Sequence, residues 1–340
     1  MTSESDNFPQ LKGLSILVTG GAGFIGSNLC EALLTSGARV RCLDNFATGH
    51  RHNIARLLDS PDFEMVEGDI RDAATCRQAC NGVDLVLHQA ALGSVPRSIS
   101  DPATSNAVNI DGFLNMLIAA KDAGVHRFVY ASSSSVYGDA PELPKVEERT
   151  GKPLSPYAIT KHVNELYAGN FKEIYGLDTI GLRYFNVFGR RQDPKGAYAA
   201  VIPAFVRQLL NHAPVQINGD GSYSRDFTYI DNVVQMNLRA LTTENPDAVN
   251  QVYNTAVGER LTIGELAKLL QKELARKDPE VREVTIEHGP ARPGDVPHSL
   301  ADISKAHNLL GYQPTHSVKE GLALAADWYF EHWRDKMQQP

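Results

Sequence analysis

The sequence has few cysteines, no long apolar run and no excess of positive charge. Its four cysteines, Cys30, Cys42, Cys76 and Cys80, lack the spacing of a zinc site or of a disulfide framework. No apolar run approaches the ~20 residues that a membrane-spanning helix needs. The polar first ten residues also lack the apolar core of a secretory signal. We therefore expect free thiols in a reduced, cytoplasmic protein with no membrane partner.

The charge balance argues against one broad class of function. Acidic residues outnumber basic residues by 40 to 33, which gives a net charge of −7 at pH 7. Proteins that bind nucleic acid usually carry a basic surface, so we expect no nucleic-acid partner. With 42% hydrophobic residues in a chain of 340, the sequence can form one large or two modest domains with a sizeable core.

A glycine-rich turn near the N-terminus is the first feature that indicates chemistry. Residues 14–19 form an apolar run typical of a buried parallel strand, and residues 27–36 have a helical pattern. Glycines between them permit a tight turn, approach of the backbone to a diphosphate, and close packing of helix on strand. The spacing G-x-x-G-x-x-G is one residue longer than the G-x-G-x-x-G fingerprint, and in this context it predicts a dinucleotide site. The candidates here are Gly20, Gly23, Phe24, Ile25 and Gly26.

An acidic residue after the second predicted strand indicates which dinucleotide binds. Asp44 follows residues 39–43 and lies 18 residues beyond Gly26. Its carboxylate can accept both hydroxyls of an adenosine ribose and would repel a 2′-phosphate. No arginine immediately follows it, so the pattern favours NAD over NADP. A capping role for Asp44 at a strand end is the alternative.

The ends of the next predicted strands supply further candidates for the NAD site. Two residues after the strand at 63–67 are positioned to meet the adenine, and small residues after the strand at 83–88 would lie beneath the cofactor. Together with the loop after Asp44, they give the set Asn45, Thr48, Gly49, Asp69, Ile70, Gln89, Ala90 and Ala91.

Tyr157 and Lys161 lie one helical turn apart on one predicted face. Ser155 can cap this helix, and Pro156 suits its first position. A free tyrosine has a pKa near ~10, but a nearby cation favours its phenolate. The pair can therefore act as a proton-transfer catalyst, although a Tyr-x-x-x-Lys pattern alone more often marks a solvated helix face.

A run of serines ends the apolar strand predicted at residues 126–130. Hydroxyls at the carboxyl end of a parallel strand point into the crevice where such sheets bind ligands. Four consecutive serines are normally a solvated loop. Placed 22 to 24 residues before Tyr157, three of them are candidates for a catalytic hydrogen-bonding group: Ser133, Ser134 and Ser135.

Strand and helix patterns alternate from residue 14 to about residue 183, which predicts an α/β fold with a doubly wound parallel sheet of the Rossmann type. Glycine and proline then become frequent and the predicted elements shorten. We expect an NAD-binding domain over residues 11–183, to which residues 231–250 return, and a smaller C-terminal substrate-binding lobe over residues 184–340. The short elements assigned to the lobe are residues 215–218, 227–230 and 252–255.

Two long predicted helices, residues 103–123 and the one containing Tyr157, have outer faces that are partly apolar. Core packing explains such faces, and pairing with a second copy in a homodimer is the alternative. The residues concerned are Phe113, Met116, Leu117, Leu166, Tyr167 and Phe171.

Together, the glycine turn, Asp44, the serines and the Tyr157–Lys161 pair resemble the extended short-chain dehydrogenase/reductase family over essentially the whole chain. Three motifs resemble its nucleotide-sugar epimerases: Arg-Tyr-Phe-Asn at 183–186, Arg-Asp-Phe at 225–227 and Ala-Arg-Pro-Gly-Asp at 291–295. The stretches 92–98 and 189–194 resemble bacterial UDP-N-acetylglucosamine 4-epimerases of surface-polysaccharide pathways.

The resemblance implies roles for individual residues. Tyr157 would be the base, Lys161 would lower its pKa and hold the nicotinamide ribose, and Ser133 would bind the sugar O4. Arg225 and Arg292 would clamp the diphosphate, a role that suits planar guanidinium groups. Surface ion pairing is the alternative for either arginine.

Further positions follow from the same resemblance. Asn186 would hold a phosphate oxygen, unless it only caps a turn, and Asp295 would bind the uridine ribose. Tyr184 would join the NAD site. The uracil would lie against Ala200, Val201, Gln216 and Asn218, and the remaining substrate candidates are Gly93, Ser94 and Ser134.

Ser299 matches a position beside the sugar C2 substituent where some relatives place a tyrosine. A serine there leaves volume for an acetamido group, whereas a bulky aromatic side chain would exclude it. Ser299 is otherwise a small loop residue.

The implied activity is C4 epimerisation of UDP-N-acetylglucosamine, and also of UDP-glucose, through transient oxidation by bound NAD. UDP-glucuronate 4-epimerase is the nearest alternative. Dehydratases and decarboxylases of the same fold need an acid where Ser134 and Ser135 stand, so they are disfavoured. A regulator that kept the fold without catalysis is a further alternative.

Overall fold

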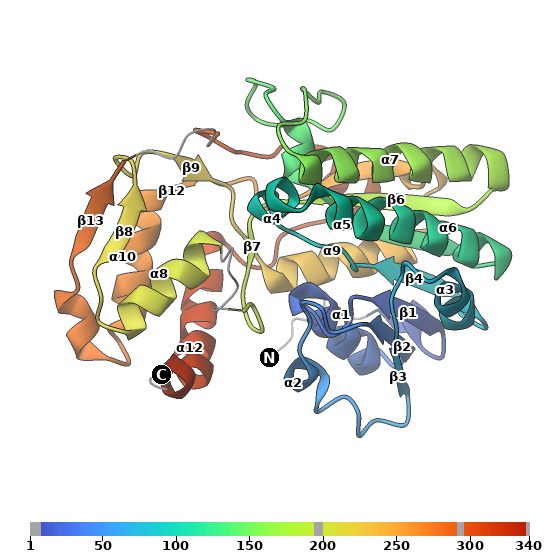
Figure 1. Cartoon of the computed structure of the whole chain (residues 1–340), viewed down its shortest axis with the longest axis horizontal. Helices are drawn as coiled ribbons and strands as arrows, with labels where there is room; N and C mark the ends of the chain where they lie inside the picture. The colour runs from blue at the N-terminus through green and yellow to red at the C-terminus, as the bar shows by residue number, and fades with distance from the viewer. Residues whose placement is uncertain (1–7, 194–199, 291–295, 338–340) are drawn as a thin grey trace.

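A seven-stranded parallel sheet organises residues 8–193, 200–290 and 296–337, the part of the chain that the computed structural model describes (Figure 1). The strand order is β11-β6-β5-β4-β1-β2-β3, and every neighbouring pair is parallel. The order reverses between β1 and β4, where sheets of this kind bind ligands beyond their carboxyl ends. The predicted doubly wound fold is confirmed. The strands are β1 (Ser15–Thr19), β2 (Arg39–Asp44), β3 (Phe63–Glu67), β4 (Leu85–His88), β5 (Arg127–Ser133), β6 (Asp178–Tyr184) and β11 (Gln251–Thr255).

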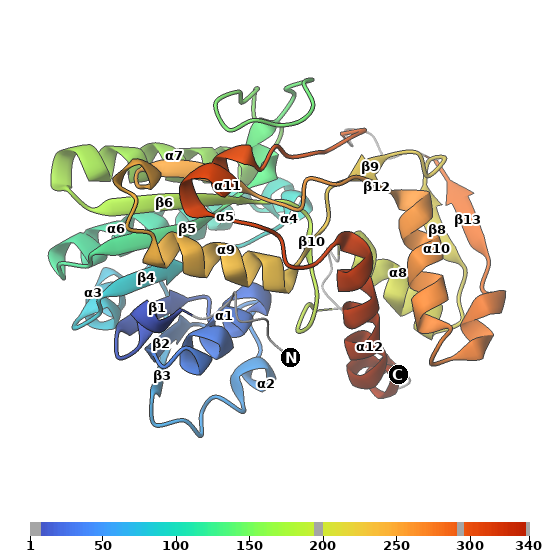
Figure 2. The same cartoon turned by 180° about the vertical axis from the view of Figure 1, so that it is seen from behind.

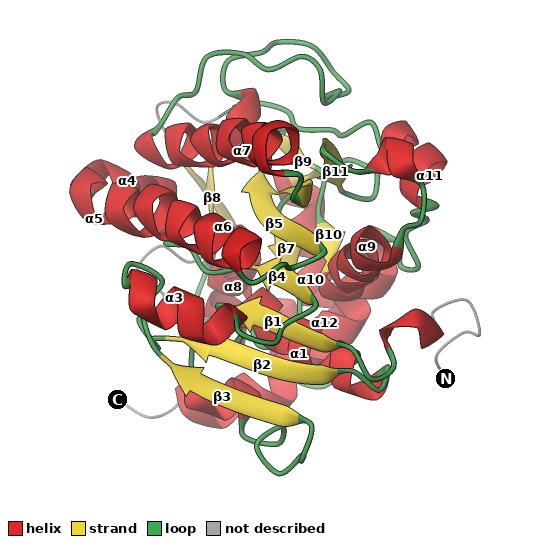
Figure 3. Cartoon of the chain, turned by 90° about the vertical axis from the view of Figure 1, so that its right-hand side faces the viewer, coloured by secondary structure: helices red, strands yellow, loops and turns green. Residues whose placement is uncertain are grey.

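Helices cover both faces of this sheet, as the end-on view in Figure 3 shows. One face carries α3 (Ala73–Cys80), α4 (Val95–Ser100), α5 (Pro102–Asn106), the π-helical turn η3 (Ala107–Asp111), α6 (Gly112–Asp122) and α7 (Pro156–Tyr175). The opposite face, turned to the viewer in Figure 2, carries α1 (Phe24–Thr35), α9 (Ile230–Thr242) and α11 (Ser304–Leu310), with the short α2 (Arg51–Ile54) packed beside α1.

Because both faces are covered, the central strands β1, β4 and β5 carry runs of successive apolar residues. Phe128 and Tyr130 of β5 pack with Phe113 of α6, whereas Val129 between them packs on the other side. Side chains alternate along a strand, so a strand buried on both faces has an unbroken apolar pattern. This is why these strands could be identified from sequence.

The helix that carries Tyr157 begins as its sequence predicts. The Ser155 hydroxyl accepts a hydrogen bond of 3.1 Å from the Ala158 N–H, and Pro156 occupies the first helical position. The helix ends at Gly176, which has a left-handed φ of 75°. It is 20 residues long, or about 30 Å, and packs along β5 and β6.

A smaller lobe lies beside the sheet (Figures 1 and 2). Its β8 and β13 pair in parallel, and α8, α10 and α12 pack against one another next to them. Two further pairs, β7 with β10 and β9 with β12, connect the lobe to the sheet. The bounds are β7 (Val187–Phe188), α8 (Val201–Leu210), β8 (Val215–Asn218), β9 (Ser224–Arg225), β10 (Thr228–Tyr229), β12 (Leu261–Thr262), α10 (Ile263–Leu274), β13 (Ile286–Gly289) and α12 (Val318–Met337).

One short element is not where the sequence predicts it. Residues 252–255 belong to β11, which pairs in parallel with β6 and forms an edge of the central sheet rather than part of the lobe. The local pattern of a short strand does not reveal its partner, which is why the position was wrong. The division into residues 11–183 and 184–340 stays a prediction.

Most of the apolar side chains predicted on the outer faces of α6 and α7 pack in the core, which is the first of the two explanations given above. Phe113, Met116 and Leu117 are at most 1% exposed and Phe171 is 6% exposed, so these four side chains belong to the core. Others are exposed on α7, including Leu166 at 62% and Tyr167 at 37%. In the described ranges, no helix is both long and apolar enough to span a membrane.

Candidate functional site

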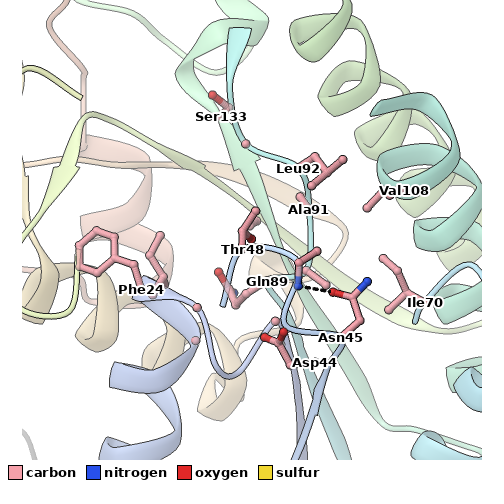
Figure 4. A pocket seen from close by; sticks show the side chains of 18 of the residues that line it. Phe24, Asp44, Asn45, Thr48, Ile70, Gln89, Ala91, Leu92, Val108 and Ser133 are labelled. Atoms are coloured by element: carbon pink, nitrogen blue, oxygen red, sulfur yellow. Dashed lines mark hydrogen bonds between the residues drawn. The ribbon is translucent and has the colours of Figure 1, made fainter. Parts of the chain in front are cut away.

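A cavity of about 510 Å³ lies along the carboxyl ends of the strands. In Figure 4, Phe24 faces Ile70 and Val108 across this cavity, with Asp44 and Ser133 at opposite ends. It is lined by all but one of the predicted NAD-site residues: Gly20, Gly23, Phe24, Ile25, Gly26, Asp44, Asn45, Thr48, Asp69, Ile70, Gln89, Ala90, Ala91, Tyr157, Lys161 and Tyr184. The remaining one, Gly49, lies behind Asp44.

The glycine turn leaves no room for side chains. A Cβ at Gly26 would come within 2.1 Å of the Gly20 carbonyl oxygen, and one at Gly20 within 2.8 Å of the Ala90 nitrogen. Helix α1 starts at Phe24 with no side-chain cap and no acidic residue in its first turn. Its first N–H groups therefore remain available to an anion, and the positive end of the helix dipole favours a diphosphate there.

Asp44 is held by the backbone around it. Its Oδ2 accepts the Ala22 N–H at 2.9 Å, and its Oδ1 accepts the Phe46 N–H at 2.7 Å. Burial raises the pKa of this carboxyl, and these hydrogen bonds oppose the effect. A Cβ at Gly49 would lie 2.9 Å from Oδ2, so glycine is required beside it. Each oxygen keeps acceptor capacity for a ribose hydroxyl.

Asp69 is engaged with its neighbours. It pairs with Arg71 at 2.7 Å and accepts from Asn45 Nδ2 at 2.8 Å. The hydrogen bond from Arg71 is the main reason why the pKa of Asp69 falls to about 2. The adjacent Ile70 supplies an apolar wall, as an adenine ring requires.

A hydrogen-bonded group lies under the middle of the cavity. The Tyr184 hydroxyl donates to Gln89 Oε1 at 2.9 Å, and Asn237 Nδ2 donates to the Tyr184 oxygen at 2.9 Å. Asn237 comes from α9, which the sequence pattern did not connect with the site. The available N–H groups at the start of α1, the Asp44 carboxylate and the apolar wall at Ile70 together fit NAD.

Tyr157 and Lys161 contact two residues at the end of β5, Ser133 and Ala131. Lys161 Nζ donates to the Ala131 carbonyl oxygen at 2.7 Å, and Tyr157 is hydrogen-bonded to Ser133. Burial lowers the pKa of Lys161 to about 8. Burial also raises the pKa of Tyr157, with the Ser133 hydrogen bond opposing it. This direction is opposite to the one predicted from the Tyr–Lys spacing, because the ammonium is bound to Ala131 and burial dominates.

The other two serines of the predicted catalytic group lie apart from the cavity lining. Ser134 and Ser135 start the 3-10 turn η4 (Ser134–Tyr137), and the Ser135 N–H donates to Ser133 Oγ at 3.2 Å. The Ser135 hydroxyl is buried, and no described residue forms a hydrogen bond with it. Only Ser133 of the three faces the cavity.

Two predicted substrate residues, Gly93 and Asn186, line the cavity. Asn186 has a positive φ of 36°, and its Nδ2 donates to the Asp226 carbonyl oxygen at 2.9 Å. One of its amide hydrogens is therefore committed to the backbone, and one remains for a phosphate oxygen. Ser94 lies outside, where it caps α4 by accepting the Arg97 N–H at 3.2 Å.

The remaining substrate candidates that the structure describes lie on separate segments of the lobe. Gln216 donates to Glu287 at 2.5 Å, and Arg225 Nη1 donates to the Ser224 and Pro297 carbonyl oxygens at 3.0 and 3.1 Å. The Ser299 N–H donates to the Ser224 carbonyl oxygen at 3.0 Å. Ala200 and Val201 start α8, Asn218 ends β8, and Arg292 and Asp295 lie outside the described residues.

The sequence analysis missed several lining residues. Most directly neighbour a predicted one, but Thr104 and Val108 come from helical segments whose local sequence gives no sign of a ligand. The missed residues are Leu43, Ala47, Gly68, Arg71, Leu92, Thr104, Val108, Ala131, Ser132 and Val187. Among the described residues, no cluster of His, Cys, Asp or Glu could hold a metal ion.

This chain is similar in sequence and architecture to several nucleotide-sugar enzymes. The profile of the NAD dependent epimerase/dehydratase family matches residues 16–256. A UDP-glucose 4-epimerase of Mycolicibacterium smegmatis is 36% identical over 315 residues, which cover 92% of this chain and 97% of that protein.

Two solved structures extend the likeness to three dimensions. A UDP-N-acetylglucosamine 4-epimerase from Methanobrevibacter ruminantium, in complex with UDP-N-acetylmuramic acid, has a TM-score of 0.87 and 36% identity, covering 94% of this chain and 99% of its own. A UDP-glucuronic acid 4-epimerase from Bacillus cereus, in complex with UDP-glucuronic acid and NAD, has a TM-score of 0.83 and 33% identity, covering 94% and 99%. This chain therefore belongs to the NAD-dependent epimerase/dehydratase family of extended short-chain dehydrogenases/reductases, and its cofactor is NAD.

Proposed function

We propose that this protein interconverts UDP-N-acetylglucosamine and UDP-N-acetylgalactosamine by epimerisation at C4, and also accepts UDP-glucose and UDP-galactose. The observation that carries the proposal is the convergence of Ser133, Tyr157 and Lys161 on one wall of the NAD cavity. A hydroxyl, a phenol and an ammonium beside a hydride carrier suit the oxidation and reduction of a secondary alcohol. Similarity to nucleotide-sugar 4-epimerases supports this choice of reaction.

The NAD would be held by the glycine turn at its diphosphate, by Asp44 at its adenosine ribose and by Lys161 at its nicotinamide ribose. The chemistry that NAD would supply there is reversible hydride acceptance, so that the sugar C4 would be oxidised to a ketone only transiently. The Tyr157 oxygen would accept the O4 proton, directly or through Ser133 Oγ, and later give it back. Because burial raises the pKa of Tyr157, the proposed base depends on the ammonium of Lys161 to stabilise its phenolate.

For inversion, the sugar must turn over while the nucleotide stays in place. Arg225 and Arg292 would hold the diphosphate and Asn186 one of its oxygens, while Asp295 binds the uridine ribose. The uracil would lie against α8 and β8, at Ala200, Val201, Gln216 and Asn218. Binding energy from these remote groups retains the reactive ketone without fixing the ring.

The preference for an acetylated sugar rests on Ser299 and on the space near it. A second cavity, of about 420 Å³, is lined by His298 and by apolar side chains that include Leu143, Leu154 and Val296. Its Lys145 is turned to the backbone and donates to the Ala140 carbonyl oxygen. Apolar walls favour an acetyl methyl group over the carboxylate of a uronate.

The protein is also proposed to be a homodimer. Five apolar side chains on α7 are between 37% and 62% exposed: Ile159, Leu166, Tyr167, Ile174 and Tyr175. Contiguous apolar side chains on a helix face often mark an interface. Light scattering at several protein concentrations would give the mass, and a monomer throughout would contradict the dimer.

The test is incubation of the purified protein with UDP-N-acetylglucosamine and no added NAD, with the sugar protons followed by NMR. Appearance of UDP-N-acetylgalactosamine would support the epimerase, the retained cofactor and the acetamido-tolerant site together. Turnover of UDP-glucose alone would remove the role of Ser299 and leave the mechanism. Turnover of UDP-glucuronate alone would identify the uronate epimerase instead.

A further inference from the structure

Helix α7 contacts the end of strand β5 at three points, of which the proposed chemistry uses two. Tyr157 is hydrogen-bonded to Ser133, and Lys161 donates to the Ala131 carbonyl oxygen. One turn further on, Glu165 Oε1 accepts the Ser132 hydroxyl at 2.6 Å. Residues spaced by four share a helix face, so three helix residues meet three consecutive strand residues. The third helix residue, Glu165, has no role in the mechanism above.

Glu165 is also held by a buried arginine from the neighbouring strand. Arg183 Nε donates to Oε1 at 2.9 Å and Nη2 donates to Oε2 at 2.8 Å. The two side chains are only 7% and 5% exposed. Arg183 Nη1 donates to the Glu147 carbonyl oxygen at 2.9 Å, so the fork cannot turn away. A bidentate pair fixes both the position and the plane of the carboxylate.

We propose that Glu165 is a positioning residue, which keeps the Lys161 ammonium charged and holds the serine-bearing end of β5 in place for Tyr157. This inference rests on the function proposed above. Glu165 does not touch the reacting atoms in this arrangement. Glu165 acts through Lys161 and Ser132, and Arg183 holds the Glu165 carboxylate in position.

The charges around Lys161 support this role. Burial lowers the pKa of Lys161 to about 8, and the Glu165 carboxylate opposes that effect. From β4, His88 faces the same region but is neutral, because burial lowers its pKa to about 3. Tyr157 on α7 and Tyr184 on β6 are buried phenols with raised pKa values, so they supply no negative charge in this state. Arg183, a further charge at this end of the sheet, is paired with Glu165 itself.

The first test replaces Glu165 by Gln in the full chain with its NAD. We expect kcat to fall about tenfold or more while KM for the UDP-sugar changes by less than about threefold, because the sugar nucleotide does not contact this residue. The alkaline limb of the kcat profile should move to lower pH, by about one unit, because Lys161 loses its proton earlier. Glu173→Gln removes an exposed carboxylate from the same helix and is the matched control. Coincident alkaline limbs for Glu165→Gln and the wild type would overturn the proposal.

A paired variant separates positioning from packing. Replacing Glu165 by Leu together with Arg183 by Met removes the ion pair without leaving a lone buried charge, and such swaps are often neutral for stability. If Glu165 only supports the fold, this double variant regains the wild-type pH profile. If Glu165 keeps Lys161 charged, the thermal midpoint recovers but the alkaline limb stays shifted.

A readout without turnover keeps the inference separate from the proposed function. The pKa of Lys161 is lower in the folded chain than in the unfolded one, so the folded chain releases this proton first and its stability rises with pH above about 8. In Glu165→Gln this rise should begin at lower pH than in Glu173→Gln. If no UDP-hexose is epimerised, the proposed function fails while these unfolding curves still test Glu165. If the curves of the two variants coincide, Glu165 does not act on Lys161.

Discussion

The wall of the site made by the sheet and the wall expected from the lobe differ in how they are assembled. The first consists of the ends of parallel strands and a glycine turn, and its predicted residues line one continuous cavity. The second is expected from β8, β9, the start of α8 and the chain around Ser299, which lie on separate segments. A parallel sheet brings its strand ends to one edge wherever the loops run, whereas separate loop segments converge only through their own tertiary contacts.

In the proposed function, cofactor and chemistry belong to the sheet and substrate choice to the lobe. Variants on one side should leave the property of the other side intact. Four variants, taken from the largest expected effect to the smallest, test that separation.

Tyr157→Phe should remove the chemistry and leave both binding functions. Loss of a general acid–base group costs about 10²- to 10⁴-fold in kcat. The NAD content of the purified protein, measured by absorbance after denaturation, should match that of the wild type. Tyr253→Phe is the control, since it removes a buried hydroxyl that donates to the Ala248 carbonyl oxygen and lies outside the cavity lining. Near-normal turnover by Tyr157→Phe would refute its assignment as the base.

Gly26→Ala should remove NAD binding at the glycine turn. The added Cβ would meet the Gly20 carbonyl oxygen at 2.1 Å, so the turn must open and the diphosphate site is lost. We expect loss of retained NAD and destabilisation of about 1–3 kcal/mol, the usual cost of overpacking. Gly169→Ala on α7 is matched, because its Cβ would have only one contact, at 3.9 Å, and should be neutral or stabilising. Full NAD content in Gly26→Ala would contradict the proposed diphosphate site at the glycine turn.

Ser299→Tyr should change which sugar nucleotide the protein prefers without affecting NAD binding. Turnover of UDP-N-acetylglucosamine, as kcat/KM, should drop about tenfold or more, while UDP-glucose is spared and NAD is retained. Ser304→Tyr, at the exposed start of α11, controls for the added ring. Equal loss on both sugars would show that Ser299 does not distinguish them.

His88→Asn should produce the smallest effect on activity, because it acts on the dependence of stability on pH. The buried His88 is bonded to Thr19 Oγ1 at 2.9 Å and stacks on Phe128, and burial lowers its pKa from 6.5 to about 3. Between these two pKa values, His88 is therefore protonated in the unfolded chain and neutral in the folded chain. The stabilisation is complete above about pH 6.5 and is lost as pH falls toward 3, by up to ~1.4 kcal/mol per unit.

Urea unfolding from about pH 7 to about pH 5 would test this slope. The variant should begin less stable, because it loses the ring stacking, but it should decline less steeply. If the stability of the wild type and of His88→Asn declined in parallel with pH, the pKa of His88 would not be lowered by folding.

The sequence was most informative where residues close together in the chain determine the local structure. The turn at Gly20 and the cap at Ser155 could be identified because neighbouring residues determine them. The place of β11 could not be, since its pairing with β6 is a contact between distant segments. The direction of the Tyr157 pKa shift was also wrong, because burial is a property of the folded chain. Glu165 was missed since nothing nearby in sequence shows that Arg183 lies against it.

The path of the chain between β6 and β11 has a consequence for how the protein is made. A ribosome that has released β6 has not yet produced the strand that pairs with its outer edge. The N–H and C=O groups on that edge stay open to other chains until residue 255 has emerged. A fragment that ends at residue 183 would keep the open edge permanently and should aggregate. Any attempt to exchange the lobe between relatives must therefore retain β11 as the last strand of the sheet.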